Sequence, residues 1–137
     1  MSQIKNYIFT ALMLLSLNVF SQKTIDEDPE ILQNSINYRI TQSQIALEQY
    51  NYFGAQNNLD EALEFAQKLD NRKSEGIIYT LKGRLQLITE KEDKAIKSLN
   101  KAIEIQRIIN DNKNLADSYK TFGDVYLVKK DYSNALD

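Results

Sequence analysis

Apolar residues recur at steps of three and four through the middle of the chain. One stripe comprises Ile78, Leu81, Leu85 and Ile88, and a second, beyond the polar stretch TEKED at 89–93, comprises Ala95, Leu99, Ala102, Ile103 and Ile109. Residues at these steps share one face of an α-helix, so the pattern predicts two amphipathic helices joined by a turn. Upstream, Asp28-Pro29-Glu30 predicts the start of an earlier helix, because Asp is a favoured N-cap and Pro suits the first helical position.

The pattern repeats every forty residues without an insertion. The matching sets are Tyr79 and Tyr119, Gly83 and Gly123, Leu59 and Leu99, Ala62 and Ala102, Glu64 and Glu104, Leu47, Leu87 and Leu127, and Ala55, Ala95 and Ala135. The connectors also agree, since LDNRKSEG at 69–76 aligns with INDNKNLA at 109–116. A fixed period of this length is typical of helical repeat arrays, in which each unit buries its apolar face against the next.

The repeated glycines require a physical reason, because a glycine inside a helix costs about 1 kcal/mol relative to alanine. We expect Gly83 and Gly123 to let the second helix of each pair approach closely, with Ala95 or Ala135 presenting little bulk at the crossing. Ala62 and Ala102 are expected to allow the same close packing toward the following repeat.

Tyr-x-x-x-Gly followed by Ala, Leu and Ala at these offsets resembles the tetratricopeptide repeat (TPR) in a forty-residue variant. Its signature positions in this chain are Tyr79, Gly83, Ala95, Leu99, Ala102, Tyr119, Gly123 and Ala135. The resemblance implies an all-α helix-turn-helix solenoid of about two and a half repeats. A lead-in at 22–35 contains the start of the first helix, and repeats follow at 36–75, 76–115 and 116–137. The first is degenerate, since Arg39 replaces the large aromatic residue and Ser43 the glycine.

The third repeat is truncated in this sequence. By the register, its second helix would need about fifteen further residues beyond Asp137. We therefore expect the helix that carries Tyr119, Phe122 and Tyr126 to lack the helix that would cover it, and we expect self-association through this uncovered repeat. The same reasoning leads to the expectation that the chain is the N-terminal part of a longer protein.

The N-terminus has the pattern of a cleavable signal peptide. Lys5 provides a positive charge, an apolar run extends from Tyr7 to Phe20, and Val19 and Ser21 are the small residues that a signal peptidase requires. Cleavage after Ser21 would remove residues 1–21 and export the protein, to the periplasm or, alternatively, to the medium. The apolar run is too short to cross a bilayer comfortably. The mature segment that remains after cleavage is expected to have no membrane span.

Composition excludes several kinds of chemistry. The chain has no Cys and no His, and its formal net charge is −2. Disulfides, thiolate catalysis and most zinc or haem sites are thereby excluded, and no electrostatic footprint for nucleic acid is visible. The stretch NDNKNLADS at 110–118 resembles a calcium loop only by chance, because Leu115 occupies the glycine position and Thr121 the glutamate position. We expect no cofactor, no metal and no enzymatic activity in this segment.

The TPR resemblance implies a concave groove lined by the first helix of each pair. Carried over by register, the groove positions are Ile77, Thr80, Arg84, Leu87, Asp117, Lys120, Asp124 and Leu127, with Asn37, Ile40 and Gln44 as equivalents in the first repeat. Such a surface could bind an extended peptide or a partner helix. The alternative is a solvated face, on which Lys120 and Asp124 form only an i,i+4 ion pair.

Two other clusters have simpler interpretations. Lys94, Lys97 and Lys101 share a helix face with acidic neighbours, which is typical of a solvated convex surface. Tyr119, Phe122, Tyr126 and Tyr132 recur at helical spacing, so they are expected to pack in a core rather than to stack on bases.

The resulting hypothesis is an exported, non-catalytic protein-interaction and sensory module. It resembles the N-terminal TPR region of Bacteroidota-type bacterial regulators, in which a histidine kinase or helix-turn-helix output domain follows. The alternative is a free-standing periplasmic or secreted TPR scaffold that gathers protein partners.

Overall fold

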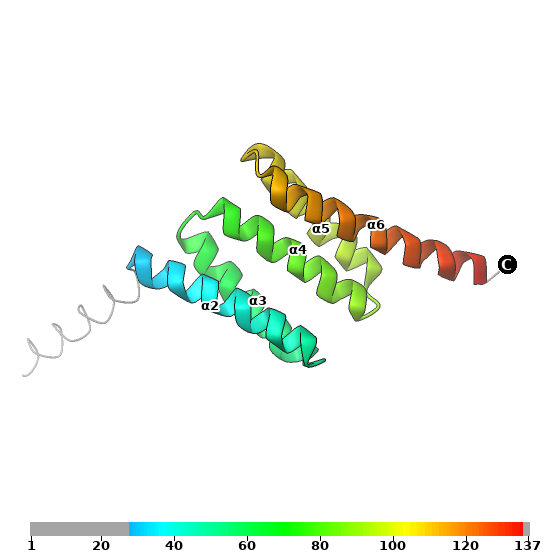
Figure 1. Cartoon of the computed structure of the whole chain (residues 1–137), viewed down its shortest axis with the longest axis horizontal. Coiled ribbons are helices and arrows are strands. Elements are labelled where there is room, and N and C mark those ends of the chain that lie inside the picture. The colour runs from blue at the N-terminus through cyan, green and yellow to red at the C-terminus, as the bar shows by residue number, and fades with distance from the viewer. Residues whose placement is uncertain (1–27, 136–137) are drawn as a thin grey trace, which may run out of the picture. The chain divides into compact units, whose positions relative to one another are not determined.

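The computed structural model of the chain describes residues 28–135, with side chains described through Lys130. These residues form five helices and no strand, which confirms the all-α prediction for this part of the chain. The helices are α2 (Pro29–Glu48), α3 (Tyr52–Lys68), α4 (Arg72–Ile88), α5 (Glu92–Ile108) and α6 (Asn112–Ala135). Within the described residues, those from Gln33 onward pack as one compact unit (Figure 1). The predicted signal peptide at 1–21 lies outside the described residues.

The start of α2 confirms the predicted helix-initiation signal. The helix begins at Pro29, and Oδ1 of Asp28 accepts a hydrogen bond from the backbone N–H of Glu30 at 2.8 Å. Because Pro has no N–H, its position at the first turn leaves no donor unsatisfied there.

A turn recurs every twenty residues along the chain. Four residues adopt a positive φ of 47–58°, and none of them is glycine: Tyr50, Asp70, Glu90 and Asn110. At each turn two backbone N–H groups bond back to the preceding helix; Asn51, for example, donates to the carbonyl of Ala46 at 2.8 Å. This is the hydrogen-bond pattern of a Schellman motif, which satisfies the last carbonyls of a helix. The two connectors that align in the sequence therefore share one backbone geometry, and the turns at Tyr50 and Glu90 adopt the same geometry.

The residue after each positive-φ position begins the next helix as its N-cap. Asn51 and Asn71 accept hydrogen bonds from the N–H of Gly54 (2.9 Å) and Ser74 (3.0 Å). Asp111 plays the same part for α6, and the hydrogen bond from Asn114 holds the pKa of its carboxyl below the ordinary value. At α5 the equivalent residue is Lys91, which makes no side-chain cap hydrogen bond.

We therefore expect Lys91→Asn to stabilise the chain by about 1 kcal/mol, because a capping side chain satisfies an orphan N–H at the start of a helix. Urea denaturation followed by far-UV circular dichroism measures the change. Lys91→Ala is the matched control, since it removes the same lysine without adding a cap. An equal gain for both variants would show that the lysine charge, and not the missing cap, is responsible.

Leu99 fills the notch that Gly83 leaves in α4. A Cβ atom built on Gly83 would lie 2.6 Å from Cγ of Leu99, whose side chain is fully buried. The prediction that Gly83 permits close helix packing is confirmed, but the residue seated on it is Leu99 and not Ala95. Gly123 differs, because a Cβ atom built on it would meet nothing within 4 Å.

The signature positions of the two repeats have different surroundings. Ala95, Leu99 and Ala102 are fully buried, and Tyr79 is half-buried beneath the ammonium of Lys101 at 5.0 Å from the ring centre. Tyr119 is 50% exposed, and Gly123 is also exposed. Ala135 lies in α6, but its side chain is outside the described side chains. The limits predicted at 76 and 116 fall one turn inside α4 and α6.

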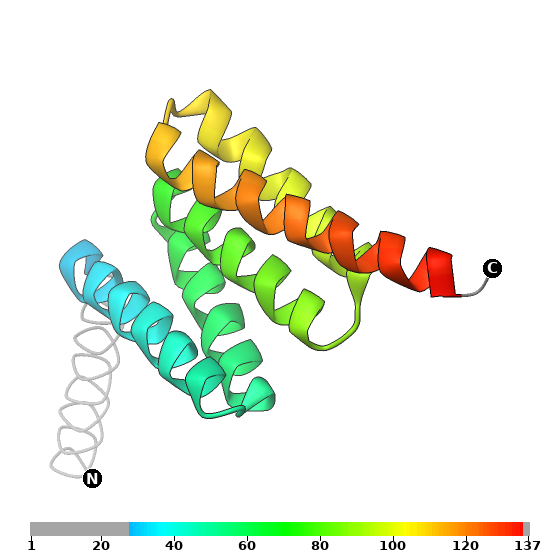
Figure 2. The ribbon, with the colours of Figure 1, turned by 45° about the vertical axis from the view of Figure 1, so that its right-hand side comes forward.

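The repeat register aligns Asp131 and Tyr132 with the start of α5 and so predicts that a new helix opens at these residues, but this prediction is wrong. The helix α6 continues without a break to Ala135, and its last turns extend past the turn between α4 and α5 (Figures 1 and 2). Lys130 occupies the position that is Glu90 in the preceding turn, yet it stays helical.

Candidate binding surface

A surface cleft of about 460 Å³ lies between the C-terminal halves of α2 and α4. Its lining residues are Gln44, Leu47 and Glu48 from α2 and Leu81, Arg84 and Ile88 from α4. Leu81 is buried and Leu47 half-buried, whereas Ile88 is 45% exposed. The cleft therefore has aliphatic walls with one amide, one carboxylate and one guanidinium at its edges.

Two of the predicted groove positions, Gln44 and Arg84, contribute to this cleft. Sequence reasoning missed the other four lining residues, Leu47, Glu48, Leu81 and Ile88. Of these, Glu48 and Ile88 each follow a predicted position by four residues and so lie one turn further on the same face. Adding one further helical turn after Gln44 and after Arg84 would have included Glu48 and Ile88 among the predicted positions.

Arg84 also connects α4 to α6. Its Nη2 atom donates to both carboxylate oxygens of Asp117, at 3.1 Å each, so two predicted groove residues from different helices are in contact. Both side chains are more than a third exposed, and such a pair contributes no more than about 1 kcal/mol. Because Arg84 is already neutralised by Asp117, the carboxylate of Glu48 gives the cleft a net negative edge.

The remaining groove positions do not form one continuous surface. Ile77 packs partly against the core formed by α2, α3 and α4, and Leu87 packs against Ala95 and Leu99. Lys120, Asp124 and Leu127 are exposed, and the ion pairs of the described side chains do not include Lys120 with Asp124. In the first repeat, Asn37 is exposed and Ile40 is half-buried against the core.

The prediction that Thr80 lines a groove is wrong, because its side chain is buried. Its hydroxyl lies 2.6 Å from that of Ser118 and 3.2 Å from Nε2 of Gln106, while Ser118 donates to Oε1 of Gln106 at 2.7 Å. These three residues, from α4, α5 and α6, close a buried ring of hydrogen bonds that we call the polar ring. One repeat earlier the same positions are the apolar residues Ile40, Ala66 and Ile78. The replacement of all three by polar residues could have indicated from the sequence that they contact one another in the core.

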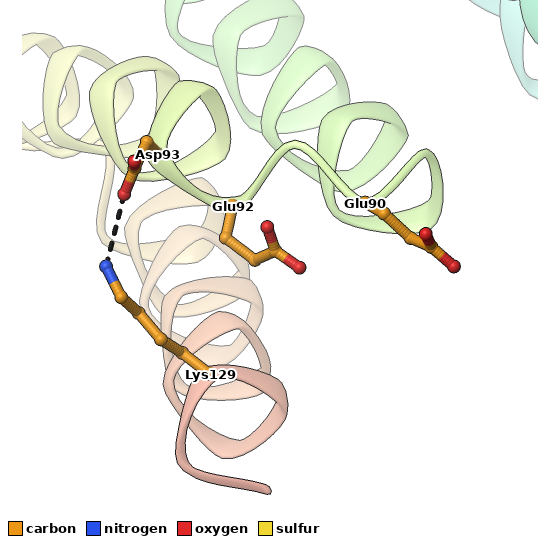
Figure 3. Close-up of a pocket in the computed structure, with 4 residues that line it drawn as sticks. All are labelled: Glu90, Glu92, Asp93 and Lys129. Atoms are coloured by element: carbon orange, nitrogen blue, oxygen red, sulfur yellow. Dashed lines mark hydrogen bonds and ion pairs between the residues drawn. The ribbon is translucent and has the colours of Figure 1, made fainter. Parts of the chain in front are cut away.

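A second hollow, of about 400 Å³, lies where the turn before α5 meets α6. It is lined by Glu90, Glu92, Asp93 and Lys129. Figure 3 shows Lys129 bonded to Asp93, at 3.1 Å, while Glu90 and Glu92 point away from this pair. Within residues 28–130, no three His, Cys, Asp or Glu side chains are placed to hold a metal ion. The hollow therefore contains an exposed ion pair, Asp93 with Lys129, beside the carboxylates of Glu90 and Glu92.

The lysine cluster on α5 is exposed at all three positions, Lys94, Lys97 and Lys101. The predicted aromatic core on α6 is only partly formed. Phe122 packs against the cluster of Ala95, Leu99 and Val125 and lies 5.1 Å from the ring of Tyr126, which is itself 51% exposed. The aromatic residues fail to form a full core because no helix in the described chain covers their outer side.

No family model, curated protein or solved structure matches this chain. Among residues 28–135, no helix combines the length and the apolar character that crossing a bilayer requires.

Proposed function

We propose that this chain is an exported, non-catalytic binding module of the TPR type, and that the cleft between α2 and α4 binds a peptide segment of a partner protein. The cleft is the observation that carries this function. It presents the aliphatic side chains of Leu47, Leu81 and Ile88 together with polar groups that can fix the orientation of a ligand. The leader-like N-terminus supports export, and the resemblance to bacterial regulators supports a role in sensing.

The chemistry of the cleft defines the peptide. An aliphatic or aromatic residue would occupy the apolar walls, and a neighbouring Lys or Arg would pair with Glu48, since the other charged residue of the lining, Arg84, is engaged by Asp117. Leu81 is already buried and forms the floor, so Ile88 is the wall residue with most surface to lose on binding.

Selection of peptides from a random display library against the full chain tests this function. We expect enriched peptides to combine an apolar residue with an adjacent basic residue and to lose about tenfold or more in affinity for Ile88→Arg, which places a charge in the apolar wall. Glu48→Lys should reverse the preference from basic to acidic peptides. The matched control is Lys97→Glu, a charge reversal on the exposed side of α5. Peptides that bind Ile88→Arg as tightly as the natural chain would place the site elsewhere.

A further inference from the structure

The cations around the cleft are each held by a carboxylate from another helix. The C-terminal halves of α2 and α4 contain four charged residues, Arg39, Glu48, Lys82 and Arg84. Carboxylates of α3 bind Arg39 and Lys82, and Asp117 of α6 binds Arg84. Among the described residues, only Glu48 of these four has no ion-pair partner. The charge that the cleft offers to a ligand is therefore that of a carboxylate.

Asp117 acts on a residue of the cleft from outside the cleft. Arg84 lines the cleft, whereas none of the described lining residues comes from α6. The Nη2 atom of Arg84 donates to Oδ1 and Oδ2 of Asp117, at 3.1 Å each. A carboxylate held in this way neutralises the guanidinium and fixes the direction in which it points.

The packing of the repeats does not require this ion pair. Forty residues earlier the two positions are Gln44 and Ile77, which carry no charge, and Ile77 packs against the apolar core of α2, α3 and α4 instead. The side chains of Arg84 and Asp117 are 39% and 49% exposed, so their ion pair adds little to stability. Its main consequence is therefore the charge that it leaves at the edge of the cleft.

Loss of the ion pair would change what the cleft selects. Arg84 and Glu48 line the same cleft, so a guanidinium released from Asp117 has the carboxylate of Glu48 as an alternative partner. That guanidinium would occupy the carboxylate to which a basic ligand residue binds, and it would also repel the basic residue. A cleft without the carboxylate of Asp117 should therefore favour neutral or acidic peptides over basic ones.

The other charges of α6 near Asp117 do not take part in the ion pair. Lys113, Lys120 and Asp124 are exposed, and they do not line the cleft. The ion pairs of the described side chains include none between these three residues and either Arg84 or Asp117. Exposed charges are screened over about 8 Å at physiological ionic strength, so direct contact with Arg84 distinguishes Asp117 from its neighbours.

We propose that Asp117 is a positioning residue that sets the charge selectivity of the cleft. By holding Arg84, it leaves the carboxylate of Glu48 to a lysine or arginine of the bound peptide. The selectivity of a site between α2 and α4 is thus determined by a third helix, α6. The proposal rests on the peptide-binding function proposed for the cleft, and its test is chosen so that the two can fail separately.

Selection from a random peptide display library, run in parallel on the natural full chain and on Asp117→Asn, tests the proposal. Peptides enriched by the natural chain should have a basic residue beside the apolar one, and peptides enriched by Asp117→Asn should not. A purely structural role of Asp117 would weaken all peptides alike and would leave this preference unchanged.

Fluorescence anisotropy with the peptide most enriched by the natural chain measures the size of the effect. Asp117→Asn should weaken its binding about fivefold. Arg84→Gln, which introduces the residue that α2 has at the equivalent position, should retain the peptide. In that background Asp117→Asn should have no further effect, because the residue through which Asp117 acts is absent.

Two control variants remove an exposed charge of α6 without touching the ion pair. Asp124→Asn removes the same kind of carboxylate, and Lys120→Gln removes the cation nearest to Asp117 in the sequence; both should leave affinity within about twofold. A basic preference that survives Asp117→Asn, or that Asp124→Asn reduces equally, overturns the role of Asp117 while the peptide-binding function stands. A natural chain that enriches no peptide overturns both.

Discussion

Alanine at Gly83 destabilises the chain by about 1–2 kcal/mol, whereas alanine at Gly123, forty residues later, stabilises it by about 0.5–1 kcal/mol. Alanine favours a helix interior by about 1 kcal/mol relative to glycine, and this gain applies to both positions. At Gly83 the new methyl group would lie 2.6 Å from Cγ of Leu99, which is the branch point of a fully buried side chain and not its flexible end. Overpacking of this kind costs about 1–3 kcal/mol and outweighs the helix gain. At Gly123 nothing lies within 4 Å, so only the gain remains.

Urea denaturation of both variants, followed by circular dichroism, measures this difference in sign. Leu99→Ala supplies the internal control, because it removes the atom that the new methyl group of Gly83→Ala would meet. In that background Gly83→Ala should cease to be destabilising, while the effect of Gly123→Ala should be unchanged. Two destabilising glycine substitutions would mean that Gly123 is covered in solution, which is the outcome expected if copies of the chain pack through α6.

Local periodicity accounts for what could be predicted about the fold. The apolar stripes that end at Ile88 and begin at Ala95 place the turn between α4 and α5 correctly, because helical spacing is a property of neighbouring residues. The start of α2 at Pro29 was predictable for the same reason. The Schellman turns were not, since Tyr50 and Glu90 are residue types that seldom adopt positive φ.

The candidate surfaces were less predictable, because they depend on which flank of a helix its neighbours cover. Arg84 and Gln44, two of the predicted groove positions, line the cleft between α4 and α2. Thr80 and Leu87 lie on the flank that α5 covers, although their spacing from Arg84 is also helical. Spacing defines a face, but only packing shows whether that face is buried.

Breaking the polar ring at one position is the second large effect that we expect. Thr80→Val keeps the shape of the side chain but removes the acceptor for Nε2 of Gln106, and Ser118→Ala removes the donor to Oε1 of the same residue. All three side chains are at least 97% buried, so water cannot replace the lost bonds. A buried polar group left without a partner costs about 1–3 kcal/mol, and each single variant should lose stability by that amount in urea denaturation.

The triple variant T80V/Q106M/S118A removes every polar atom of the ring and should therefore recover most of what the single variants lose. Replacing all partners by apolar groups of similar shape is close to neutral, because no buried group remains unsatisfied. The fold already tolerates this arrangement one repeat earlier, where Ile40, Ala66 and Ile78 pack within one apolar cluster. We expect the triple variant to lie within about 1 kcal/mol of the natural chain, far from the sum of its parts. Losses that simply add would show that the three side chains act independently and that the ring is not a unit. Recovery would show that the polar ring contributes little net stability beyond what an apolar set of the same shape supplies, as the set Ile40, Ala66 and Ile78 does one repeat earlier.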